Sequence, residues 1–156
     1  ISRVTQLFNK TNQLNLSTRR LSEKEVLEWS AVQSNLLLAV IVSDSFGDMG
    51  IVGVIGLEMK GTLGIISDFI LSCRAMGRQV EQAMIHLAVN ELTRLGLKDV
   101  QARYLPTERN RPTLDIFRSI GFDEQQDKLF VFDCVKPFPK PDAIEIDYDS
   151  VKFGLL

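Results

Sequence analysis

Cysteine and histidine are scarce in this chain of 156 residues. Its two cysteines, Cys73 and Cys134, form no CxxC pair, and His86 is its single histidine. Isolated cysteines argue against a disulfide scaffold and a zinc site, and they suit a reducing, cytoplasmic compartment. The acidic residues also lack metal-ligand spacing, so we expect no metal in this domain.

Charge of one sign and long apolar runs are also lacking. The net charge is −2 and the pI about 5.5, so no overall basic field attracts nucleic acid or an acidic membrane. No stretch reaches the roughly 20 apolar residues of a membrane span. HExxH, GxSxG and Walker motifs are absent. We therefore expect neither nucleic acid nor membrane as a partner.

The length and the 45% hydrophobic content fit one domain, residues 1–156, with its own core. Because the chain opens without methionine, we expect it to be a piece of a longer protein. Its periodicity predicts an α/β (α+β) fold, in which helices flank a mixed, mostly antiparallel sheet. Helices are expected at residues 2–13, 22–30, 79–95 and 113–120. Extended segments or strands are expected at residues 14–20, 36–46, 51–59, 62–73, 97–105, 128–135 and 143–148.

Several individual residues allow more specific predictions about these helices and strands. Ser22 followed by Glu25 is a capping-box signature for the second helix. Glycines within the expected strands, at positions 53, 56 and 64, indicate bulges or close backbone approach. His86 lies opposite the apolar face of its helix and is expected to face solvent. Cys134 is interpreted as a packing residue.

The segment from Asp68 to Gly96 runs from an apolar strand through a short turn into an amphipathic helix. Backbone N–H groups at a helix start carry partial positive charge, and Arg74 and Arg78 add full charges. Gly77 leaves room for an anion beside the main chain. The turn therefore suits a phosphate, although a left-handed turn with solvated arginines gives the same pattern.

Two local motifs carry a family resemblance. The strand DFILSC followed by RAMGRQ, and the segment NRPTLDIFRSIGF, resemble signatures of the GNAT (Gcn5-related N-acetyltransferase) fold. RVTQLFNKTNQLNLSTRR, SCRAMGRQVE and YLPTERN are similar to the C-terminal GNAT-like region of FkbH-like proteins. Those proteins transfer a glyceryl group from 1,3-bisphosphoglycerate to an acyl carrier protein in polyketide biosynthesis, and they usually carry a HAD-type phosphatase domain.

The resemblance implies cofactor-binding roles. Arg74, Gly77, Arg78 and Gln79 would hold the phosphate of coenzyme A or of a carrier-bound phosphopantetheine, and Asn110 would contact the pantetheine region. Gln79 departs from the family pattern, which has a small residue there and leaves more room. Phe117 stands where many members have a tyrosine that donates a proton to the leaving thiolate. Amine acetylation by that route is therefore in doubt.

Cys73 ends the strand directly before this turn. The helix start and the arginines favour a thiolate, so Cys73 is the candidate catalytic nucleophile for a thioester-linked acyl intermediate. The other interpretation is packing, because free cysteines are often buried.

The segment FNKTNQLNLSTRR is rich in amide and basic side chains. Amides offer paired donors and acceptors, and arginine binds carboxylate or phosphate with two N–H groups. A small hydroxylated or phosphorylated acyl group would suit them, whereas helix capping and a solvated turn are the alternative. The candidate substrate-binding residues are Asn9, Asn12, Gln13, Thr18 and Arg19.

The sequence thus indicates acyl or glyceryl transfer to the phosphopantetheine thiol of an acyl carrier protein. Two alternatives stay open. One is a non-catalytic carrier- or substrate-binding module beside a phosphatase domain. The other is a small-molecule N-acetyltransferase that uses coenzyme A.

Overall fold

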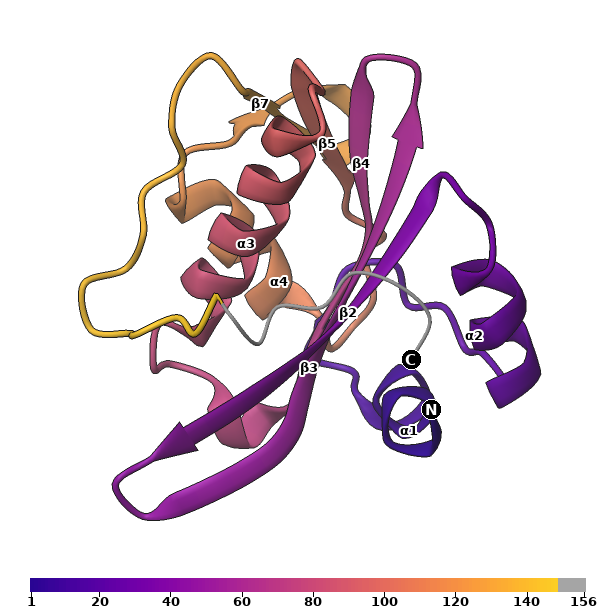
Figure 1. Ribbon diagram of the computed structural model, residues 1–156, viewed down its shortest axis with the longest axis vertical. Coiled ribbons are helices and arrows are strands. Elements are labelled where there is room, and N and C mark those ends of the chain that lie inside the picture. The colour runs from indigo at the N-terminus through magenta and orange to yellow at the C-terminus, as the bar shows by residue number, and fades with distance from the viewer. Residues whose placement is uncertain (149–156) are drawn as a thin grey trace.

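The computed structural model describes residues 1–148, and a seven-stranded sheet lies between two layers of helices (Figure 1). Its hydrogen-bonded order is β2-β3-β4-β5-β7-β6, and the short strand β1 pairs with β4. The strands are β1 Leu14–Asn15, β2 Asn35–Asp44, β3 Gly47–Lys60, β4 Leu63–Leu71, β5 Asp99–Arg103, β6 Asp123–Glu124 and β7 Leu129–Asp133. The predicted mixed, mostly antiparallel sheet is confirmed.

Each face of the sheet buries its own apolar cluster. On one face lie α1 (Ser2–Lys10) and α2 (Glu23–Ser30), which pack Val4, Phe8 and Val26 against the strands. On the other face lie α3 (Val80–Arg94) and α4 (Arg111–Ser119), over the larger core. Ser22 and Glu25 form the predicted capping box at the start of α2.

The first three long strands form the predicted antiparallel meander, with β2 paired to β3 and β3 to β4. The glycines in these strands allow close approach and irregular register. A Cβ at Gly64 would lie 2.8 Å from Leu92 Cδ1, and one at Gly53 would lie 2.9 Å from Met84 Cε. The register also shifts next to Gly56. Both predictions for these glycines are confirmed.

The two central strands, β4 and β5, are parallel but share only part of their length. Their pairing covers Leu63–Ile66 of β4. Beyond it, β1 pairs with Ile70 and Leu71 instead. The Leu16 N–H donates to the Phe69 carbonyl, and the Leu16 carbonyl accepts from the Leu105 N–H. The connection between α1 and α2 therefore fills the space where β4 and β5 diverge.

Three predictions about this architecture were wrong. Helix α1 ends at Lys10 rather than at residue 13, because Thr11 adopts extended backbone. Residues 143–148 form no strand despite their alternating pattern. His86 is buried rather than solvent-facing, because the segment after β7 covers it: its Nδ1 lies 3.0 Å from the Phe138 carbonyl oxygen.

Within residues 1–148 no helix is long and apolar enough to cross a membrane.

Candidate active site

Cys73 is exposed and lies immediately beyond the end of β4, in a short 3-10 turn, Cys73–Ala75. It lines a cavity of about 370 Å³ together with Leu71 and Ser72. The opposite wall comes from α1 and the residues after it, including Arg3, Lys10 and Gln13. The packing interpretation of Cys73 therefore does not hold, whereas Cys134 packs, partly buried, against the core.

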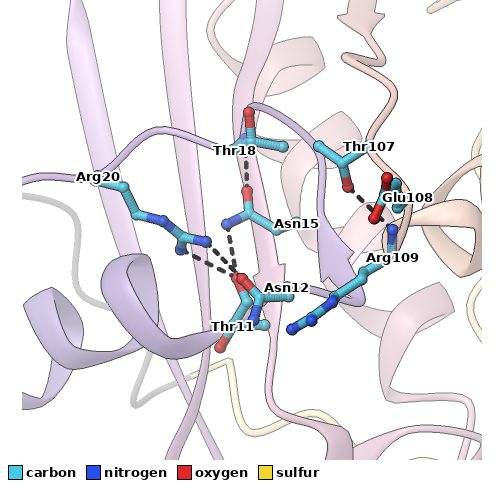
Figure 2. A pocket seen from close by; sticks show the side chains of 8 residues that line it. All are labelled: Thr11, Asn12, Asn15, Thr18, Arg20, Thr107, Glu108 and Arg109. Atoms are coloured by element: carbon cyan, nitrogen blue, oxygen red, sulfur yellow. Dashed lines mark hydrogen bonds between the residues drawn. The ribbon is translucent and has the colours of Figure 1, made fainter.

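A second cavity of about 350 Å³ adjoins the first (Figure 2). It is lined by Thr11, Asn12, Asn15, Thr18, Arg20, Thr107, Glu108 and Arg109. Thr11, Asn12 and Arg109 line both cavities, so the two are direct neighbours, and we refer to them together as the depression. Its walls come from the α1–α2 connection and from the loop after β5.

The structure brings together three of the five candidate substrate-binding residues. Asn12, Gln13 and Thr18 line the depression, with Cys73 at one end. Asn9 and Arg19 do not line it. The Asn9 amide donates to the carbonyls of Thr5 and Leu21, at 2.9 and 2.6 Å. Arg19 binds the buried carboxylate of Asp68 and lies over the Trp29 ring. Both side chains therefore have structural partners that explain their placement.

Three donors of the predicted phosphate turn are engaged within the chain: the Gly77 N–H and the side chains of Arg74 and Arg78. The Gly77 N–H donates to Glu81 Oε1 at 2.7 Å, so a carboxylate of the chain itself occupies this donor. Arg74 Nη2 donates to the Met49 carbonyl at 2.7 Å. Arg78 pairs with Asp44 at 2.5 Å, and the pKa of Asp44 is lowered by the Phe46 backbone N–H and by Arg78. A phosphate that used the Gly77 N–H would have to displace the Glu81 carboxylate.

Gln79 occupies a left-handed backbone conformation, with φ 63° and ψ 10°. This region costs a side-chain-bearing residue about 1–2 kcal/mol, whereas glycine adopts it freely. We expect Gln79→Gly to raise the free energy of unfolding by about 0.5–1 kcal/mol, because glycine's greater freedom in the unfolded chain offsets part of the gain. Urea unfolding measures it, and Gln79→Ala, which keeps the backbone penalty, should show no such gain.

Asn110 is fully buried and hydrogen-bonded through both atoms of its amide. Its Nδ2 donates to the carbonyls of Asn15 and Leu105, and its Oδ1 accepts from the Thr107 N–H and the Tyr104 hydroxyl. These bonds tie the loop after β5 to Asn15 in β1. Asn110 therefore organises the depression from beneath without lining it.

The position of Phe117 offers no proton donor. Its ring is completely buried and contacts the rings of Phe69, Phe122 and Phe130. The hydroxyl of Tyr104 could in principle donate a proton, but Tyr104 is buried too, and burial raises the pKa of its phenol. Its hydroxyl already donates to Asn110 at 2.8 Å. Neither side chain lines the depression.

Sequence reasoning missed Arg109, the cationic side chain shared by both cavities. Its loop, TERNRP, is rich in charge, and no local pattern separates Arg109 from Arg111. No group of three or more His, Cys, Asp or Glu side chains within residues 1–148 is arranged to hold a metal ion.

Solved structures with a similar fold are known. The chain superposes on the ribosomal-protein-S18-alanine N-acetyltransferase of Escherichia coli with a TM-score of 0.60 and 9% identity, covering 93% of this chain and 92% of the other. The GNAT acetyltransferase of Staphylococcus aureus Mu50 superposes with a TM-score of 0.57 and 7% identity, covering 71% of this chain and 75% of the other. The chain has the GNAT fold. PaiA N-acetyltransferase of Thermoplasma acidophilum, solved with coenzyme A, superposes with a TM-score of 0.53 and 12% identity, covering 70% of this chain and 69% of the other. No family model and no curated protein matches the sequence.

Proposed function

We propose that this GNAT-fold domain is an acyltransferase in which the Cys73 thiol receives the acyl group. The observation that carries the proposal is the exposed Cys73 at one end of a depression lined by basic and amide side chains. Exposure and nearby cations are what distinguish a reactive cysteine from a packing one. The GNAT acetyltransferases among the structural neighbours support the same class of reaction.

The reaction proceeds by exchange at a carbonyl carbon. The Cys73 thiolate attacks the carbonyl of an activated acyl donor, a thioester or an acyl phosphate. The bond to the donor sulfur or phosphate oxygen breaks, and the leaving group departs with the bonding electrons. An acceptor thiol then loses its proton to the solvent and attacks the carbonyl carbon of the Cys73 thioester. The new acyl–sulfur bond forms, the bond to the Cys73 sulfur breaks, and the Cys73 thiolate is restored. The cations that line the cavity stabilise the oxyanion of each tetrahedral intermediate.

The acceptor in this proposal is the phosphopantetheine thiol of an acyl carrier protein. The resemblance to FkbH-like proteins supports it, and the amide-rich segment that lines the depression suits a small hydroxylated acyl group. In the parent protein, a HAD-type phosphatase domain would act on the same substrate. Residues Arg74–Gln79 would then contact the phosphate of the arm after Glu81 releases the Gly77 N–H.

A second candidate is a small-molecule N-acetyltransferase that uses coenzyme A. The structural neighbours favour it, since they include N-acetyltransferases and one is solved with coenzyme A. Two observations count against it here: Phe117 cannot donate a proton to the leaving thiolate, and the Asn110 amide is fully engaged within the chain.

An acceptor panel separates the candidates. The purified domain is supplied with a radiolabelled acyl thioester or acyl phosphate, and then with phosphopantetheinylated carrier protein, free pantetheine or a set of amines. We expect label on the thiols and none on the amines. Label on amines alone would establish the second candidate. Binding of carrier without transfer to any acceptor would instead indicate a non-catalytic docking module.

A further inference from the structure

The depression carries an unusual concentration of unneutralised positive charge. Arg3, Lys10, Arg20 and Arg109 line it, and within residues 1–148 none of the four forms an ion pair. Arginines elsewhere commonly bind carboxylates: Arg19, Arg78, Arg94, Arg111 and Arg118 each do so. The four cations of the depression therefore lack the carboxylate partners that these other arginines have.

Neutral acceptors hold two of these cations in position. Arg20 donates to the carbonyls of Phe8 and Thr11 and to Asn12 Oδ1. Arg3 donates to the Ile51 carbonyl and to the Gln6 amide oxygen. Neutral partners fix a guanidinium without cancelling its charge. The result is a positioned cationic wall on the side of α1.

Arg109 approaches from the opposite side. Figure 2 shows its side chain reaching from the loop after β5 toward Asn12, while Arg20 reaches toward the same residues from the α1–α2 connection. Within residues 1–148 no hydrogen bond or ion pair engages the Arg109 guanidinium, whereas the Arg109 backbone N–H donates to Thr107 Oγ1. The loop is itself anchored by Asn110. Arg109 thus has a fixed base and a guanidinium available for a ligand.

We propose that Arg109, with Arg20 opposite, binds a phosphate group in this depression, at a site separate from the turn at Arg74–Gln79. Guanidinium groups match phosphate oxygens with parallel N–H donors. The hydroxyls of Thr18 and Thr107 line the same cavity and add neutral donors. The inference goes beyond the proposed transfer, because it rests on the placement of the cations and is tested by binding without turnover.

Among the residues that line the two cavities, one carries a carboxylate: Glu108, which lines the second cavity. It is exposed and lies beside Arg109, so it opposes an anionic ligand at short range. Substitutions of Glu108 and of Arg109 should therefore change the affinity for phosphate in opposite directions. Neutralising Glu108 should tighten phosphate binding, whereas removing Arg109 should weaken it.

Calorimetric titration with inorganic phosphate, glycerol 3-phosphate and phosphopantetheine tests the site. We expect Arg109→Ala to weaken binding of the preferred probe by about tenfold or more, since each charge-assisted contact contributes about 1.5–3 kcal/mol. The affinity of Arg109→Lys should lie between those of the unmodified domain and of Arg109→Ala, and Glu108→Gln should bind the probe a few-fold more tightly than the unmodified domain. Tighter binding of glycerol 3-phosphate identifies a small phosphorylated substrate. Tighter binding of phosphopantetheine that Arg109→Ala weakens would place the phosphate of the carrier arm here rather than at Arg74–Gln79.

Arg111→Ala is the matched control. It removes the same charge two positions away, where Arg111 pairs with Asp115 outside the depression. Equal affinities of the Arg109 and Arg111 variants would overturn the inference, as would absence of binding by the unmodified domain. Either result would leave acylation of Cys73 intact, so the two proposals fail separately. Arg109 is exposed, and unfolding curves of both variants check that the fold is retained.

Discussion

Replacing Cys73 with alanine should lower acyl transfer to a thiol acceptor by about a thousandfold or more, the order expected when a covalent nucleophile is removed. The thiolate divides the reaction into two steps, and without it the donor and acceptor must react directly. Because the side chain is exposed and outside the core, the variant should keep its fold. Steady-state transfer rates with a radiolabelled acyl donor measure the effect.

Two further variants decide what such a loss means. Cys134→Ala removes the other cysteine, which packs against the core and does not line the depression. This variant should transfer the acyl group at the rate of the unmodified domain. Cys73→Ser keeps the shape but supplies a weaker nucleophile, and it should accumulate any acyl group as a stable ester. A Cys73→Ala domain that still transfers at the original rate would show direct exchange between two bound thiols.

Replacing Arg19 with alanine should lower the free energy of unfolding by about 3 kcal/mol, because it leaves a buried carboxylate without its cation. Asp68 is completely buried in β4, where it accepts from Arg19 and, at 2.5 Å, from the Ser17 hydroxyl. Arg19 is partly exposed, so its removal strands the charge of Asp68 rather than its own. Urea unfolding followed by Trp29 fluorescence measures the change.

The reciprocal variant should cost less. Asp68→Asn removes the buried charge and keeps its shape, and Arg19, which is already 32% exposed, turns to water. The control Arg111→Ala breaks an exposed pair and should cost under about 0.5 kcal/mol. Equal, small effects of Arg19→Ala and Arg111→Ala would contradict a structural role and return Arg19 to the candidate substrate-binding residues.

Much of the fold follows from local signals. The Ser22–Glu25 capping box needs only neighbouring residues, and the meander of β2, β3 and β4 follows from apolar runs separated by short turns. His86 was misplaced because a helical wheel shows one buried face, whereas the segment around Phe138 covers a second face of α3. The pairing of β1 with β4 joins residues more than fifty positions apart, and no local pattern indicates it.

The candidate site likewise includes residues that the sequence indicates and residues that it does not. Cys73, Asn12, Gln13 and Thr18 could be found from sequence, because their chemistry and their place beside the end of a strand are visible there. Arg109 could not, since its significance lies in lining both cavities without forming an ion pair, and neighbouring residues in the sequence do not indicate either property. Arg19 shows the converse, because its partner Asp68 lies in a strand far along the chain.

The most direct test of the account is peptide-mapped mass spectrometry of the unmodified domain after brief exposure to an acyl thioester or acyl phosphate and acid quenching. The account predicts one acyl group, carried on the peptide containing Cys73, which disappears when pantetheine or a phosphopantetheinylated carrier protein is added. Acyl transfer to the acceptor with no adduct at Cys73 at any time would contradict it.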